Sequence, residues 1–211
     1  MKKNIFSSLR VLSLILVAAT LTMSCNKSKN ETSENSGQTI IDCIMTRTSI
    51  RAYTDQPIGA DTVEILLRAG MAAPTAVNAQ PWHFIAVTDK AKLEELATGS
   101  FQPQMLQQAA LVIVVCGDLT KALEGKGQDF WIQDCSAATE NILLAAHALG
   151  LGAVWTGGYP IEERVASISE ALHLPSTLIP LCAIVIGHPA EQPEPKDKWK
   201  SENVSYNEYG K

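Results

Sequence analysis

The chain has 211 residues, of which 46% are hydrophobic and 18% charged, a composition typical of one globular domain and unlike that of a disordered chain. Three of its 17 basic side chains lie in the first 24 residues, so the remainder carries a net charge of −8. This acidic body argues against sequence-independent binding of nucleic acid, which needs a basic face that displaces counterions. The five cysteines and four histidines show no C-x-x-C pair and no zinc or iron–sulfur spacing, so we expect no metal site.

The N-terminus has the layout of a secretory signal. In residues 1–25 a basic start precedes an apolar run from Val11 to Ala19 and then small residues up to Cys25. The run is shorter than the roughly 20 residues that span a bilayer. Ser24-Cys25 resembles the end of a bacterial lipobox, although Thr22 stands where that pattern usually has Leu. We expect an exported protein, anchored to a membrane only through a lipid on Cys25; a plain cleaved signal or an uncleaved anchor is the alternative.

Residues 26–38 are polar and small, with almost no apolar group to bury, which predicts a flexible tether. The sequence therefore divides into a signal peptide (1–25), a tether (26–38) and one folded domain (39–211).

Hydrophobic periodicity predicts alternating helices and strands in the folded domain. The predicted helices cover residues 40–45, 61–73, 89–96, 129–149 and 161–172. The predicted strands cover residues 82–88, 111–116, 153–155 and 178–187. Asp61 and Glu64 have capping-box spacing, Pro74 ends the second helix, and Gly150 ends the longest one. Cys116 and Cys182 lie in apolar runs, which predicts buried thiols.

This order of elements predicts a sandwich with a central sheet between helices. The chain has no G-x-G-x-x-G fingerprint and no phosphate-binding Gly-rich loop between a strand and a helix. These absences argue against a Rossmann dehydrogenase and a P-loop enzyme.

The first segment that suits ligand chemistry is the arginine segment, residues 47–51. Arg47 and Arg51 flank hydroxyl side chains, and guanidinium groups bind phosphates and polar rings through planar, bidentate donors. The alternative is a solvated basic turn that pairs with Asp42 and Asp55.

The second is the proline loop, residues 74–82, which joins a predicted helix to a predicted strand. Its small residues and its Asn78 and Gln80 amides suit a flat heterocycle. The alternative is a rigid turn whose amides satisfy the local backbone.

Two further segments also suit ligand chemistry. The glycine loop, residues 155–160, contains Gly157 and Gly158, which permit close approach of a ligand or a tight turn. Lys196 and Lys198, in the C-terminal tail (residues 188–211), are rare bases on an acidic body; alone they indicate a solvated charge cluster.

Taken in order, these segments carry a family resemblance. The motifs are R-x-S-x-R at 47–51, P-T-x-x-N-x-Q-P-W-H-F at 74–84, A-L-G-L-G at 148–152, and G-H-P at 187–189 with K-x-K at 196–198. Together they resemble the nitroreductase family of flavin-dependent oxidoreductases, from about Thr39 to about Trp199.

The resemblance implies a nitroreductase-like α+β fold, an α/β/α sandwich with a central mixed sheet. It also implies an obligate homodimer with two FMN molecules at the interface and an extended C-terminal tail around the partner. At position 198 this chain has Lys, where many members of the family have Arg.

The resemblance implies cofactor-binding residues in all four segments and no catalytic side chain. The arginine segment and the tail lysines would hold the phosphate, with Arg51 near the pyrimidine edge of the ring. The proline loop would come from the partner subunit, and a backbone N–H of the glycine loop would face N5. The implied residues are Arg47, Thr48, Ser49, Arg51, Pro74, Thr75, Ala76, Asn78, Thr156, Gly157, Gly158, Lys196 and Lys198.

The implied activity is an FMN-dependent oxidoreductase with NADH or NADPH as co-substrate. A reduced nicotinamide gives hydride to N5, and a nitroaromatic, quinone or similar small molecule then accepts it. Three alternatives stay open: an exported flavin- or ligand-binding lipoprotein without nicotinamide turnover, a specialised flavin dehydrogenase or dehalogenase on the same fold, and a structural envelope protein.

Overall fold

The computed structural model describes residues 39–98 and 103–210. The predicted signal peptide and tether lie outside the described residues. The chain divides into two compact units, residues 1–44 and 45–211. Residues 39–46 are helical, as their spacing predicts. Among the described helices, none has the length and apolar character that crossing a membrane requires.

Four strands form one sheet: β1 (Trp82–Val87), β2 (Leu111–Asp118), β3 (Gly152–Gly157) and β4 (Leu178–Gly187). Their order is β1-β2-β4-β3, and each neighbouring pair is antiparallel. All four strands were predicted from sequence. Every residue of β2 is buried, and only the first two residues of β4 are partly exposed, as expected of central strands covered on both faces.

The prediction of a mixed sheet is wrong for the described strands. Helix α6 (Phe130–Ala148) carries the chain back across the sheet, so β2 and β3 run in the same direction. Strand β4 lies between them and runs opposite to both. No two neighbours among these four strands are therefore parallel.

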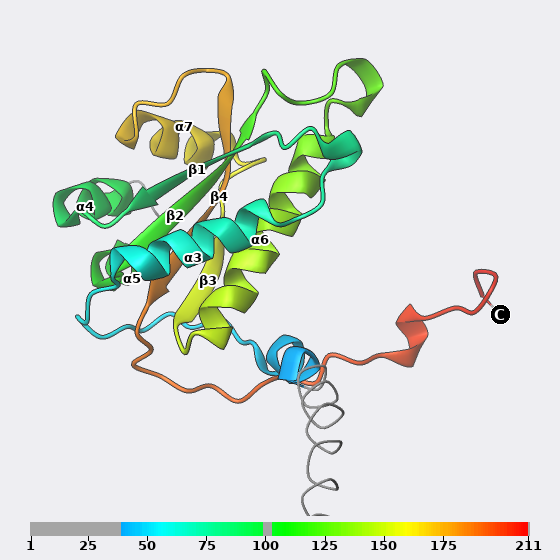
Figure 1. The fold of residues 1–211 in the computed structure, drawn as a ribbon, viewed down its shortest axis with the longest axis horizontal. Helices are drawn as coiled ribbons and strands as arrows, with labels where there is room; N and C mark the ends of the chain where they lie inside the picture. The colour runs from blue at the N-terminus through cyan, green and yellow to red at the C-terminus, as the bar shows by residue number, and fades with distance from the viewer. Residues whose placement is uncertain (1–38, 99–102, 211) are drawn as a thin grey trace, which may run out of the picture. The chain divides into compact units, whose positions relative to one another are not determined.

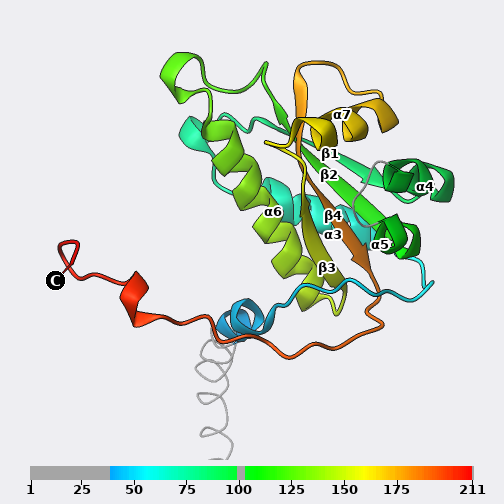
Figure 2. The same ribbon diagram turned by 180° about the vertical axis from the view of Figure 1, so that it is seen from behind.

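Helices cover both faces of the sheet (Figures 1 and 2). Helix α3 (Ala60–Met71) and α6 pack on one face, against a cluster that includes Ile113. Helices α4 (Lys90–Thr98), α5 (Pro103–Gln108) and α7 (Glu162–Ala171) contribute to the cluster on the other face. The three-layer α/β/α sandwich is confirmed.

Helix ends agree with the sequence in part. The capping box at Asp61 is wrong, because α3 begins one residue earlier after Gly59 and has no side-chain cap. Asp89 caps α4, because Lys92 N donates to Asp89 Oδ1 at 2.9 Å. Gly150 ends α6 in the left-handed region, with φ of 73°. Helix α5 was not predicted.

The cysteines in the apolar runs are buried thiols, as expected. Cys116 and Cys182 have no exposed surface, and burial raises the pKa of each to about 12. Cys135 of α6 is also buried and free. These thiols belong to the core.

The arginine segment is attached to the sheet through backbone hydrogen bonds. Ile50 N donates to Ala153 O of β3 at 3.1 Å. Residues 52–54 bond with residues 188–190, at the end of β4, at 2.9 Å. The sheet thus fixes the course of the backbone just after Arg47.

Two motif glycines make room for this attachment. A Cβ on Gly152 would lie 2.6 Å from the Ile50 side chain, and one on Gly187 would lie 2.8 Å from Tyr53. Ile50 and Tyr53 are both buried. Gly152 of A-L-G-L-G and Gly187 of G-H-P are therefore needed for packing under the arginine segment.

Gly152→Ala is expected to lower the free energy of unfolding by about 1–3 kcal/mol, because the added methyl overlaps Ile50 and overpacks the core. Gly157→Ala is the control, since nothing lies within 4 Å of a Cβ there. Thermal unfolding of both variants checks this. An equal melting temperature for Gly152→Ala and wild type would contradict the packing role.

Candidate functional site

The arginine segment lies at the outer edge of β3. Arg47, Thr48 and Ser49 are partly buried, whereas Arg51 is exposed. Arg47 Nε lies 3.3 Å from Glu140 Oε1 of α6, and only 19% of the Arg47 side chain is exposed. Arg47 is therefore partly buried and paired with Glu140. It is not the solvated base of the alternative interpretation.

Helix α6 holds the start of this segment at two points. Besides the ion pair from Glu140, His147 Nε2 lies 3.0 Å from Thr46 Oγ1, at hydrogen-bond distance. Glu140 and His147 are seven residues apart on α6, which places them on one face two turns apart. The helix therefore fixes both the main chain before Arg47 and its guanidinium.

Glu191, at the base of the C-terminal tail, holds the other end of the segment. Its Oε1 accepts hydrogen bonds from Arg51 N at 2.5 Å and Ala52 N at 3.2 Å. A hollow of about 320 Å³ lies between the tail, the end of α6 and Thr48. The sequence offered no signal for Glu191, which is one acid in a tail rich in Pro, Glu and Lys.

Internal bonds and one buried acid fix the proline loop. Ala76 N donates to Asp134 Oδ1 at 2.9 Å, and Asp134 is 6% exposed. Gln80 N donates to Thr75 Oγ1, and Gln80 Nε2 to Asn78 Oδ1, both at 3.1 Å. The side chains of Thr75 and Asn78 thus accept hydrogen bonds from within the loop. This is what the alternative interpretation, a rigid turn, predicts.

The loop nonetheless presents an unusual backbone to solvent. Val77 has φ of 46°, Asn78 58° and Gln80 51°. A β-branched residue rarely adopts this left-handed region, and Val77 is 81% exposed. The sequence does not reveal this conformation of Val77, because a valine carries no signal for a positive φ. Pro74, at the start of the loop, is also exposed.

The ladder of β3 shows which backbone groups of the glycine loop are free of the sheet. Ala153 O bonds outward to Ile50, whereas Gly158 N donates inward to Leu181 O at 2.9 Å. Since directions alternate along an antiparallel strand, the N–H and C=O of Gly157 point away from β4. The outward donor expected from this loop is therefore Gly157 N–H, and Gly158 N–H is already bonded.

Other contacts agree with that direction. Arg164 Nη1 of α7 donates to Gly157 O at 3.2 Å. Thr156 Oγ1 donates to Ala183 O at 2.7 Å, so this hydroxyl is used within the sheet. A Cβ on Gly157 would meet nothing within 4 Å. The edge beside Gly157 is open.

The arginine segment and the glycine loop thus share one sheet edge. The segment bonds to Ala153, and Gly157 is four residues farther along β3, about 13 Å at the usual rise per strand residue. Lys196 and Lys198 lie in residues 192–210, all of which are exposed. The tail extends away from the sheet in both views (Figures 1 and 2).

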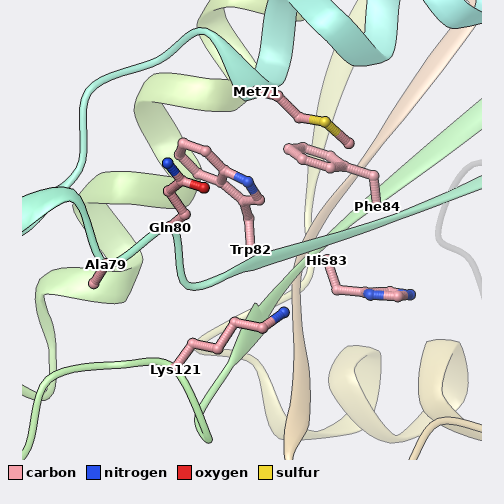
Figure 3. A pocket seen from close by; sticks show the side chains of 7 residues that line it. All are labelled: Met71, Ala79, Gln80, Trp82, His83, Phe84 and Lys121. Atoms are coloured by element: carbon pink, nitrogen blue, oxygen red, sulfur yellow. The ribbon is translucent and has the colours of Figure 1, made fainter.

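A second hollow, of about 330 Å³, lies at the opposite edge of the sheet beside β1 (Figure 3). Trp82 and Phe84 lie on one side of the strand with Met71, and His83 projects from the other. Lys121 also lines it, but its Nζ is paired with Asp118 Oδ2 at 2.9 Å. None of the predicted cofactor residues lines this hollow.

The β3 edge has the chemistry of a site for a long ligand with an anionic end. Arg47 supplies charged donors at one end, and Gly157 supplies a backbone donor and free space at the other. Phosphate and a heterocycle that accepts hydrogen bonds fit these ends. In residues 39–98 and 103–210, no group of three or more His, Cys, Asp or Glu is placed to hold a metal ion.

Comparison with known proteins shows one family that is similar to this chain. The model of the Nitroreductase family matches residues 44–104 and 98–188. A relative from Methanothermobacter thermautotrophicus, named "Putative NADH dehydrogenase/NAD(P)H nitroreductase", is 42% identical over 165 residues, which are 78% of this chain and 85% of the relative.

Two solved structures match this chain over almost their whole length. A crystal structure from Bacteroides thetaiotaomicron with the same description is 41% identical, with a TM-score of 0.76, and covers 81% of this chain and 98% of that one. An FMN-dependent nitroreductase from Clostridium difficile is 30% identical, with a TM-score of 0.73, and covers 80% of this chain and 99% of that one.

Asp134→Ala is expected to free the proline loop, because Ala76 N–H loses its buried acceptor, at a cost of about 1–3 kcal/mol. Hydrogen exchange at the Ala76 amide should become at least about tenfold faster. Asp134→Asn keeps a side-chain oxygen and is the matched control, with slower exchange than Asp134→Ala. Equal exchange in all three proteins would contradict the role of Asp134.

Proposed function

Because the chain belongs to the nitroreductase family, we propose that it binds FMN and uses NADH or NADPH to reduce small acceptors. The resemblance in the motifs is thereby confirmed at the level of the family. The observation that carries the proposal is the β3 edge, which has a held guanidinium at Arg47 and an outward N–H at Gly157. A relative described as FMN-dependent and others named for NAD(P)H support the cofactor and the co-substrate.

The residues present fit FMN. Arg47 binds the phosphate through its Nη groups, with Thr48 and Ser49 beside it and Lys196 and Lys198 closing over it from the tail. Lysine at 198 keeps the charge but lacks the bidentate fork of Arg. The phosphate end is therefore the positively charged end of the site.

The ring end is formed by backbone and open space. Bound FMN would supply the redox chemistry, a hydride transfer from the nicotinamide to the acceptor. Gly157 N–H would donate a hydrogen bond to the ring, and Arg51 would supply positive charge near the pyrimidine edge, which would stabilise the reduced form. Thr156 and Gly158 hold the loop in the sheet. No side chain of this chain acts as acid or base.

The acceptor class follows from the openness of this edge. Gly157 has no side chain over the site, and nothing lies within 4 Å of where one would start. Flat molecules of different outline would therefore have room beside Gly157. Nitroaromatics, quinones and similar small molecules are the proposed acceptors.

The proposal includes a homodimer. Apolar side chains of α3, the proline loop and both ends of α6 are exposed in the single chain, namely Ile65, Met71, Val77, Phe130 and Leu149. A second copy would bury them. In the dimer, Pro74, Thr75, Ala76 and Asn78 cover the partner's cofactor, and the exposed tail crosses the partner.

The proposal also includes export and a lipid anchor at Cys25, which rest on the signal-like pattern of residues 1–25. Export would separate the folded domain from the reduced nicotinamides of the cytoplasm. The same pattern therefore favours the second candidate function, a flavin-binding lipoprotein without nicotinamide turnover.

Turnover distinguishes the two functions. The purified protein, supplied with FMN, is expected to oxidise NADH or NADPH when a benzoquinone or a nitrofuran is present. The spectrophotometric rate of nicotinamide oxidation, with and without acceptor, measures this. Tightly bound FMN with no acceptor-dependent oxidation of either nicotinamide would favour the lipoprotein without turnover.

Truncation after Pro195 tests the role of the tail, because it removes Lys196 and Lys198 but keeps Glu191 at the base of the arginine segment. The truncated protein is expected to lose dimer stability and to bind FMN at least about tenfold more weakly. Light scattering and flavin titration measure the two effects. A stable dimer with unchanged FMN affinity would exclude the proposed role.

A further inference from the structure

Among residues 39–98 and 103–210, the Arg47 guanidinium has one ion pair, which Glu140 forms from one side. Its Nε faces Glu140 Oε1 at 3.3 Å, and within these residues neither Nη atom has an ion pair, so their N–H groups can take another partner. A bidentate contact with phosphate uses two parallel N–H donors of the guanidinium. The ion pair with Glu140 therefore leaves a phosphate-binding edge unoccupied.

A long arginine side chain has many rotamers, and a ligand that needs one of them bears the cost of ordering it. Here two contacts from α6 restrict that freedom before any ligand arrives. His147 bonds to Thr46, directly before Arg47, and Glu140 binds the guanidinium itself. With 19% of the Arg47 side chain exposed, its packing restricts it further.

We propose that Glu140 is a positioning residue that orients the guanidinium of Arg47 toward the phosphate of the cofactor. The inference rests on the proposed function, since it takes Arg47 to be the phosphate ligand. Glu140 does not touch the cofactor; it acts through Arg47. No motif in the sequence indicates this role.

A carboxylate near a phosphate also repels it, so two effects oppose each other. The Glu140 side chain is 48% exposed, and water and salt screen a repulsion that acts through solvent. Orientation acts at 3.3 Å from Nε, a shorter range than the repulsion, and is therefore screened less. Orientation is therefore the larger effect, and removal of Glu140 weakens phosphate binding.

The test compares FMN with riboflavin, which lacks the phosphate. Dissociation constants of both are measured by flavin fluorescence on the apo form of the full protein. Glu140→Ala is expected to weaken FMN binding about tenfold and to leave riboflavin binding unchanged. Glu140→Gln keeps a side-chain oxygen of the same reach beside Nε and should retain most of the preference for FMN. A merely structural role would weaken both ligands equally.

The chain offers a matched control in α3. Glu64 Oε1 accepts from Arg68 Nε at 2.8 Å, the same pair of atoms as in the site, but both side chains are well exposed. Glu64→Ala removes the same charge and an exposed Arg–Glu pair away from the site. It is expected to leave both affinities unchanged, so any general effect of net charge is measured separately.

The remaining outcomes separate the inference from the proposed function. Arg47→Ala should reduce the FMN-to-riboflavin preference at least as much as Glu140→Ala. If Arg47→Ala reduces it and Glu140→Ala leaves it unchanged, or raises FMN affinity, the positioning role is overturned and the phosphate assignment stands. If Arg47→Ala leaves the preference unchanged, the phosphate assignment fails and the positioning role fails with it.

Discussion

The close packing of helix α6 on the sheet is the constraint on which the site depends. A Cβ on Gly117 of β2 would lie 2.2 Å from the Trp131 ring, and one on Gly70 of α3 would lie 2.9 Å from Ile142. Two glycines thus let α6 approach both the sheet and α3. At this distance Asp134 and Glu140 reach the proline loop and the arginine segment, so one helix positions both.

Much of the fold follows from local patterns in the sequence. The apolar runs at 111–116 and 178–187 are the two central strands, and Gly150 ends the longest helix as expected. The direction of β4 was not predictable in the same way. Periodicity gives the elements but not which strand lies between β2 and β3, and that placement makes the neighbours antiparallel.

The segments that form the site could be predicted from the sequence, but the contacts that position them could not. The arginine segment, the proline loop and the glycine loop were identified from their own residues. Glu140 and Asp134 were not, because each lies 58 or more residues from its partner in the chain and an isolated acid on a long helix has no local signature. The outward direction of Gly157 N–H likewise depends on pairing with β4, which the sequence does not display.

The central claim is that this chain is a flavin oxidoreductase with its cofactor at the β3 edge. The most direct measurement is the visible spectrum of the purified protein, before and after NADH and NADPH are added without oxygen. The account predicts flavin absorption bands that either nicotinamide bleaches. A colourless protein that FMN does not reconstitute would contradict it.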